Sequence, residues 1–222
     1  MIGPFLEHLK RLHGSAVLRR REDVLARQVR VLIPDDVASM LDVGCGDGNI
    51  AASVAAQRGI TVDGVEVLAR PKCAVPYQLF DGVTLPYPAE SFDVVTLIDV
   101  LHHTTDATLL LREASRVSKK YVIIKDHFCH NRLDRVILTV MDWFGNRSHG
   151  VDLTYAYLRP REWSKLFQEC ALSLDQSQDR LGLYPIPFNL LFEDGKHFLY
   201  LLSKERALPY AALNTPTSLV MP

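Results

Sequence analysis

The chain has 222 residues, of which 48% are hydrophobic, and its formal net charge is −1. This hydrophobic content is enough for one sizeable core, so we expect a single domain. The near-neutral charge gives no global electrostatic case for nucleic acid, and no nucleic-acid partner is expected. Four scattered cysteines form no CxxC pair, which disfavours a zinc knuckle or redox motif and suits a reducing compartment.

The N-terminal sequence MIGPFLEHLKRLHG carries charges at Glu7, Lys10 and Arg11. These charges interrupt any apolar core, so the segment does not resemble a signal peptide. Apolar runs fall short of the ~20 residues needed to cross a bilayer. We therefore expect a cytoplasmic protein with no membrane span; the oligomeric state is left open.

The first half of the chain alternates between helical and strand patterns. Apolar residues recur at helical spacing over residues 16–33, and Pro34 ends that helix. A short apolar run at Met40–Val43 leads through glycines into Ile50–Ala56, which indicates a strand, a tight turn and a helix. Two further strands are predicted over Ile60–Val67 and Tyr77–Phe80.

The pattern continues with Phe92–Ile98, a nearly continuous apolar run typical of a strand buried on both faces of a parallel sheet. Asp106 is placed to cap a helix over Ala107–Val117, and Tyr121–Ile124 indicates another buried strand. Strands alternating with helices predict a parallel sheet with right-handed crossovers.

The rhythm changes after Lys125. Residues 126–158 are long for a connection and indicate a substrate-side insertion containing a helix over Leu133–Phe144. Arg159-Pro160 opens another helix. Two closing strands, over Leu172–Gln178 and His197–Ser203, are predicted to form an antiparallel edge pair. We expect one domain over residues 1–208, with an N-terminal helical segment at 1–35 and a tail at 209–222.

The run LDVGCGDG, from Leu41 to Gly48, lies between a predicted strand and a predicted helix. Its glycines allow a sharp turn and close approach of a ligand, and the helix after it presents free N–H groups. The G-x-G-x-G spacing is one residue shorter than the dinucleotide fingerprint. Asp42 before it would repel a pyrophosphate but assist a sulfonium and an ammonium group. This favours S-adenosylmethionine (SAM) over a glycine-rich turn with no ligand.

Acidic residues end the next two predicted strands. Glu66 can accept hydrogen bonds from both ribose hydroxyls of a nucleoside, and the alternative is an exposed strand-end glutamate. Asp81 can accept from an adenine amino group, and the alternative is a residue of an Asx turn.

Residues 39–125 resemble the class I SAM-dependent methyltransferases of the small-molecule, type-11 kind. LDVGCGDG is similar to their first motif, and DGVTLPYPAESFDVVTLIDVLHH to their D-x-x-x-L-P-(F/Y)-x-x-x-S-F-D stretch followed by a strand and L-x-H. The resemblance implies a Rossmann-like α/β fold with a seven-stranded sheet of order 3-2-1-4-5-7-6. It also implies that strand seven is antiparallel, that helices cover both faces, and that SAM lies across the carboxyl ends of the first strands.

The resemblance further implies that the backbone around Leu97, Ile98 and Asp99 approaches the methionine part of SAM. The expected cofactor-binding residues are Asp42, Gly44, Cys45, Gly46, Gly48, Glu66, Val67, Asp81, Gly82, Ile98 and Asp99.

Methyl transfer needs a base only when the acceptor must lose a proton. We expect His127, His103 and Asp126 as catalytic candidates, because they lie at the strand ends. His103 occupies the place of the recurring family histidine, which can equally be structural, and Asp126 and His127 can instead form a helix cap or loop hydrogen bonds.

Ubiquinone-type O-methyltransferases carry an E-x-x-E-H metal-assisting group where this chain has Asp99, His102 and His103. Aspartate and histidine are competent ligands. However, Asp99 can face SAM instead, and adjacent histidines often point apart. We therefore expect no metal.

The leading hypothesis is an enzyme that transfers the methyl group of SAM to a small-molecule acceptor by in-line displacement, with oxygen or nitrogen favoured over carbon. One alternative is a nucleic-acid methyltransferase, although no (D/N)-P-P-(Y/F) motif follows the fourth predicted strand. Another is a SAM-binding protein without methyl transfer. The glycine spacing argues against a nicotinamide oxidoreductase.

Overall fold

The computed structural model describes residues 19–146, 154–184, 189 and 195–204. A helix over residues 19–32 comes first. The later elements are β1 (Ser39–Val43), α2 (Asn49–Arg58), β2 (Thr61–Glu66), β3 (Tyr77–Leu79), β4 (Phe92–Ile98), η1 (Leu101–His103), α3 (Ala107–Val117), β5 (Ser118–His127), α4 (Arg132–Asn146), α5 (Pro160–Glu169), β6 (Leu172–Gln178) and β7 (His197–Lys204).

The seven strands form one sheet in the order β3-β2-β1-β4-β5-β7-β6. The first five strands in chain order pair in parallel, whereas β7 is antiparallel to both β5 and β6. This confirms the fold class, the strand order and the antiparallel seventh strand. β5 is longer than expected at both ends, and its pairing with β7 continues to His127, opposite His197.

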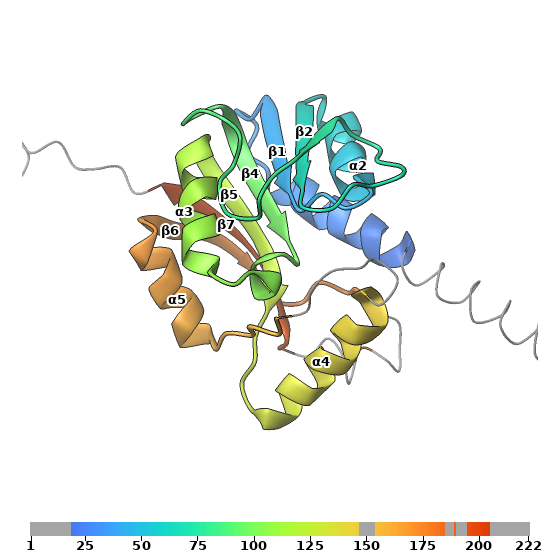
Figure 1. The fold of residues 1–222 in the computed structure, drawn as a ribbon, viewed down its shortest axis with the longest axis vertical. Helices are drawn as coiled ribbons and strands as arrows, with labels where there is room; N and C mark the ends of the chain where they lie inside the picture. The colour runs from blue at the N-terminus through green and yellow to red at the C-terminus, as the bar shows by residue number, and fades with distance from the viewer. Residues whose placement is uncertain (1–18, 147–153, 185–188, 190–194, 205–222) are drawn as a thin grey trace, which may run out of the picture.

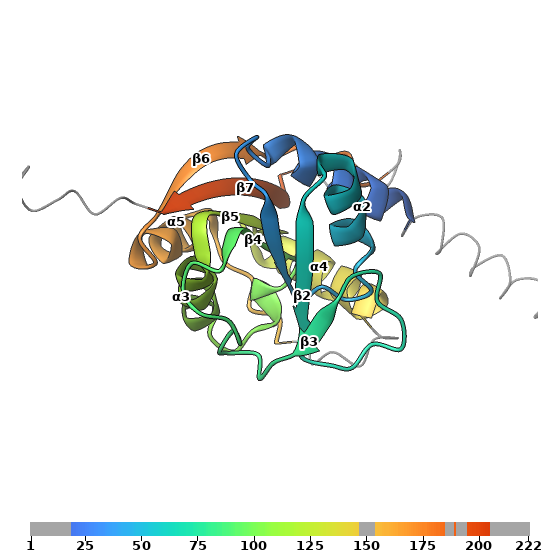
Figure 2. The same ribbon diagram turned by 90° about the horizontal axis from the view of Figure 1, so that it is seen from above.

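Helices cover both faces of the sheet (Figure 2). Side chains of α3 and α5 pack against one face, around a core that includes Leu111, Trp163 and Phe198. The helix over residues 19–32 and α2 pack against the other face, around Leu25 and Val54. The sheet is therefore buried on both sides, which explains the nearly continuous apolar sequence of β4.

Helix α4 lies apart from both of these layers, beyond the carboxyl ends of the central strands (Figure 1). It comes from the expected substrate-side insertion, and its side chains Asp134, Leu138 and Asp142 are buried. Arg147 and His149 of the insertion, and the tail at 209–222, lie outside the described residues. Within the described part of the chain, no helix is long and apolar enough to cross a membrane.

Candidate active site

The turn between β1 and α2 is built from three glycines in the left-handed region. The φ angles of Gly44, Gly46 and Gly48 are 67°, 59° and 73°. A Cβ on Gly44 would lie 2.7 Å from Cγ2 of Val100, and one on Gly48 would lie 3.1 Å from the backbone nitrogen of Ala74. A Cβ on Gly46 would meet nothing within 4 Å. The loop is thus packed tightly at its two ends and open at its middle, as a loop that carries a ligand requires.

The Glu66 carboxylate at the end of β2 holds this loop. It accepts hydrogen bonds from the backbone nitrogen of Gly46 at 2.9 Å and from that of Val67 at 2.8 Å. Arg70 donates to it at 3.1 Å. No role was expected for Arg70, which forms the charged partner of a nearly buried carboxylate. Glu66 therefore fixes the middle of the glycine loop and keeps acceptor capacity for a ligand hydroxyl.

Asp42 lies buried beneath the loop and accepts a hydrogen bond from the Thr96 hydroxyl at 2.6 Å. Burial raises the pKa of Asp42 to about 7; the Thr96 hydrogen bond opposes this rise, and the charge of Glu66 adds to it. No described cation pairs with Asp42. A cationic ligand group would favour its ionised form, so this carboxyl suits the ammonium and sulfonium of SAM.

Two further residues expected to bind the cofactor, Asp81 and Cys45, differ in their exposure to solvent. Asp81 is exposed, and its Oδ1 accepts hydrogen bonds from the backbone nitrogens of Val83 at 2.8 Å and Thr84 at 2.6 Å. The Asx-turn interpretation therefore holds in this structure, and the adenine contact of Asp81 and Gly82 stays a prediction. Cys45 is buried with its sulfur against Gly64, so only its backbone is available to a ligand.

Asp99 follows β4 in a left-handed conformation, with φ of 56°. Its carboxylate accepts a hydrogen bond from Nζ of Lys125 at 2.5 Å and another from the Arg21 guanidinium. Burial favours the neutral acid, but Lys125 and Arg21 outweigh it and hold the pKa of Asp99 well below its usual range. Neither partner was expected from the sequence; the available signal for Lys125 was a single charge at the end of an apolar strand.

His102 of η1 is fully buried between two carboxylates. Its Nδ1 lies 2.7 Å from Oδ1 of Asp126, and its Nε2 lies 3.4 Å from Oδ2 of Asp142. Burial alone would lower the pKa of His102, but Asp126 and Asp142 raise it to about 10. The Tyr157 hydroxyl donates a hydrogen bond to Asp142. His102 is thus an imidazolium at neutral pH and connects η1 to β5 and α4.

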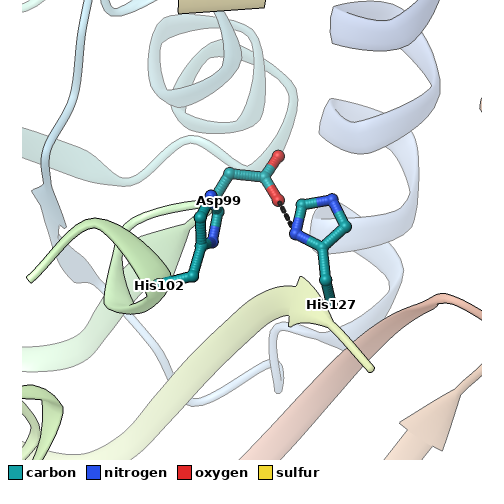
Figure 3. A group of neighbouring side chains, drawn as sticks. All are labelled: Asp99, His102 and His127. Carbon is teal, nitrogen blue, oxygen red and sulfur yellow. Dashed lines mark ion pairs between the residues drawn. The ribbon is translucent and has the colours of Figure 1, made fainter. Parts of the chain in front are cut away.

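His127 ends β5 and is buried. Figure 3 shows its Nδ1 directed at the Asp99 carboxylate. This nitrogen lies 3.4 Å from Oδ1 of Asp126 and 3.6 Å from Oδ1 of Asp99. Burial and the nearby Lys125 ammonium lower the pKa of His127. Its imidazole is therefore neutral at pH 7, and Nδ1 lies near both carboxylates without a hydrogen-bond partner among the described residues.

The other two expected catalytic residues lie close by. His103 is half-buried, and its ring centroid is 4.0 Å from that of His102. Burial and the charge of His102 lower the pKa of His103 to about 4, so this ring is also neutral. Asp126 is fully buried and bonded to His102 and to the backbone nitrogen of His127. It is placed to orient the histidines rather than to meet an acceptor.

Two groups of side chains are close enough to share a metal ion: Asp99, His102 and His127, and His102, His103 and Asp142, with donor atoms within 4.8 Å in each. In the first group, Lys125 and Arg21 already bind the Asp99 carboxylate. In both, His102 is held by carboxylates. A cation at either place would have to replace existing positive charge, so the absence of a metal requirement stays our prediction.

The expected site residues therefore gather along one edge of the sheet. The glycine loop, Glu66 and Val67 follow β1 and β2, and Asp99 and the histidines follow β4 and end β5. A Rossmann-like sheet of this strand order, with a glycine loop after its first strand, has the architecture of the class I SAM-dependent methyltransferases.

Residues 17–177 match a family model described as a methyltransferase domain. The match covers more than half of the chain, and the chain belongs to this family. S-adenosylmethionine is accordingly its cofactor.

Named relatives match shorter stretches. A ubiquinone biosynthesis O-methyltransferase of Pseudomonas fluorescens is 36% identical over 92 residues, covering 36% of this chain and 39% of the relative. Methyltransferase GfsG of Streptomyces halstedii is 33% identical over 120 residues, covering 47% and 43%. The chain thus spans less than half the length of these relatives.

Among solved structures, an S-adenosylmethionine-dependent methyltransferase of Mesorhizobium loti aligns with a TM-score of 0.59 at 14% identity. The alignment covers 80% of this chain and 96% of the other. At this identity, the likeness supports the fold.

Proposed function

We propose that this chain transfers the methyl group of SAM to an oxygen or nitrogen atom of a small molecule. Several relatives have names that support this: a 27-O-demethylrifamycin SV methyltransferase, a ubiquinone biosynthesis O-methyltransferase and a norajmaline N-methyltransferase. The expected acceptor side of this chain begins at the carboxyl ends of β4 and β5, next to the glycine loop.

SAM supplies an activated methyl group when bound. The chain's own contribution is to hold and orient its partners. The open middle of the glycine loop at Gly46, with Glu66 beneath it, supports a nucleoside site, and buried Asp42 supports a place for the cationic methionine part. Asp81, Gly82, Ile98 and Asp99 are proposed contacts along the same edge.

The observation that carries the proposed reaction is the neutral, buried imidazole of His127, whose Nδ1 lies 3.4 Å from Asp126 and 3.6 Å from Asp99. That placement leaves Nε2 as the nitrogen that accepts a proton from the hydroxyl or ammonium of the acceptor. Asp126 and Asp99 then stabilise the imidazolium that forms. His103, neutral and half-buried, is proposed as a second ring on the acceptor side.

The test measures S-adenosylhomocysteine formation with a panel of catechols, phenols and secondary amines. His127→Asn keeps a polar group near the Nδ1 position and removes Nε2. We expect turnover to fall at least ~100-fold, within the usual range for loss of a general base, while the affinity for S-adenosylhomocysteine by calorimetry is unchanged. The exposed His130 gives a matched control, His130→Asn, which should keep full turnover.

Equal turnover in His127→Asn removes this residue as the base. Absence of product with every acceptor contradicts a small-molecule acceptor of these classes. Failure to bind S-adenosylhomocysteine contradicts the cofactor site itself.

A further inference from the structure

A cavity lies between the start of α4 and the start of α5, away from the expected cofactor-binding residues. Its volume is about 410 Å³, within the range of ~300–1,000 Å³ for small-molecule sites. Arginine dominates its lining: Arg132 and Arg135 come from α4, and Arg159 immediately precedes α5. None of the cofactor residues lines it.

The three guanidinium groups have no acidic partner among the described residues. Glu162 is the one carboxylate in the lining, and it accepts a hydrogen bond from the backbone nitrogen of Arg159 at 2.6 Å. Asp134 on the same helix is buried, and it pairs instead with Lys196, 3.7 Å away. Three arginines against one glutamate leave the lining with a formal charge of +2.

The backbone around the cavity is held in place. Cys129 donates its backbone N–H to the carbonyl of Leu158 at 3.0 Å, which joins the segments before α4 and α5. The Asn131 side chain accepts from the backbone nitrogen of Asp134 at 3.0 Å and so caps α4. Because both helices begin here, the positive ends of two helix dipoles add to the charge of the arginines.

Tyr157 gives the cavity an aromatic wall. Its ring is buried, and its hydroxyl is already used by Asp142 on the side of the histidine cluster. Tyr157 is 4% exposed, so it offers the cavity a small apolar surface. This surface lies next to cationic groups that match a planar or tetrahedral anion in bidentate fashion.

We propose that this cavity binds a phosphate monoester attached to an apolar body. A phosphate monoester carries a charge of about −1.5 to −2 at pH 7, which balances the charge of +2, whereas a single carboxylate does not. Guanidinium forks of Arg132, Arg135 and Arg159 hold the phosphate, and the body lies against Tyr157. The site is separate from the cofactor site and does not depend on the reaction proposed above.

The experiment is calorimetry of the full chain with phenyl phosphate, with excess S-adenosylhomocysteine present to fill the cofactor site. Phenyl phosphate should bind at least tenfold more tightly than benzoate, because of charge, and at least fivefold more tightly than inorganic phosphate, because of the aromatic wall. The double variant Arg132→Ala/Arg135→Ala should weaken phenyl phosphate at least tenfold. Both side chains are exposed, so the fold should survive.

The matched control is Arg27→Ala/Arg180→Ala, which removes two exposed arginines that do not line the cavity. It should leave the affinity for phenyl phosphate within twofold. If both double variants weaken the binding of phenyl phosphate equally, the loss comes from the change in net charge, and the proposal is overturned. If benzoate binds as tightly as phenyl phosphate, the phosphate assignment is overturned. If inorganic phosphate binds as tightly as phenyl phosphate, the apolar body is overturned. If S-adenosylhomocysteine abolishes the binding of phenyl phosphate, the phosphate binds in the cofactor site and the proposal is overturned.

Discussion

Residues of similar chemistry at the carboxyl edge of the sheet carry different charges because their neighbours differ. Asp99 has two cations against it and stays ionised, whereas Asp42 has none and its pKa rises to about 7. His102 has two carboxylates beside it and is an imidazolium, whereas burial and the nearby Lys125 lower the pKa of His127 and keep it neutral. Such divergent pKa values among groups in one place are typical of functional sites.

The raised pKa of Asp42 predicts that SAM binding depends on pH. Near pH 7 the free protein holds a proton on about half of these carboxyls, and a cationic ligand favours the ionised form, so binding releases a proton. The affinity for S-adenosylmethionine should therefore rise by several-fold between pH 5.5 and 7, with a limit of ~10-fold per pH unit for one proton. Calorimetry in two buffers of different ionisation enthalpy measures both effects.

Asp42→Asn supplies the control for that pH dependence. It keeps the shape and the Thr96 contact but cannot ionise, so its affinity should be lower and should not change over the same pH range. An affinity of the native protein that is flat with pH, with no proton released, would show that Asp42 does not sense the cofactor.

The positive charge around Asp99 predicts turnover without a metal ion. Lys125 and Arg21 already neutralise the carboxylate that a cation would need. Dialysis against EDTA should leave S-adenosylhomocysteine formation unchanged, and added Mg²⁺ or Zn²⁺ should not raise it. Activity that is lost with EDTA and restored by one of these ions would show that the histidines bind a metal after all.

At the scale of elements, local sequence signals predicted some boundaries and long-range pairing decided others. β4 and α3 begin and end at the residues expected, because a continuous apolar run and the Asp106 cap act locally. β5 extends to His127 because β7, some 70 residues later, pairs with it there.

The candidate site also combines features that local sequence predicts with features that it does not. The glycine spacing and the acidic residues at the ends of β1 and β2 can be recognised in the sequence. The Arg21–Asp99 pair joins residues 78 positions apart, and no periodicity indicates it. Asp142 belongs to an insertion outside the stretch of residues 39–125 that carries the family resemblance, so its role could not be predicted. The one signal in the sequence was its position four residues after Leu138, which places both on the same face of a helix.

Asp106 caps the N-terminus of α3. Asp106 accepts hydrogen bonds from the backbone nitrogens of Thr108 at 2.9 Å and Leu109 at 3.1 Å. Asp106→Ala should lower the free energy of unfolding by about 1 kcal/mol. For a chain of this size, that corresponds to a fall in Tm of roughly 2–4 °C. Asp106→Asn, which retains a cap acceptor, should lose less than half as much; an equal loss would assign the effect to charge rather than capping.

At the scale of the whole molecule, His102 connects parts that are distant in the chain. Its Asp126 partner lies next to the carboxyl end of β5, and its Asp142 partner comes from α4, which lies beyond the carboxyl ends of the strands (Figure 1). The network therefore joins the expected cofactor-binding sheet to the insertion, and its charge state should be visible in the stability of the molecule.

The pKa values of His102 and Asp126 determine how the stability of the fold depends on pH. The pKa of His102 is raised from 6.5 to about 10, so its stabilising contribution is complete below pH 6.5 and is lost as the pH rises through 10. The pKa of Asp126 is depressed, so its contribution is present above pH 3.8 and is lost at lower pH. Between about pH 4 and 6.5 the network therefore stabilises the fold most.

His102→Gln leaves two buried carboxylates without their cation. At pH 6 we expect it to lower the free energy of unfolding by about 3–5 kcal/mol, the usual loss when one partner of a buried ion pair is removed. At pH 10 the native imidazole is itself half-deprotonated, so the difference between variant and native protein should shrink. Urea unfolding at both pH values measures it, with the exposed His130→Gln as control. A difference that is the same at pH 6 and pH 10 would mean that His102 contributes packing alone, and that its charge does not join α4 to the sheet.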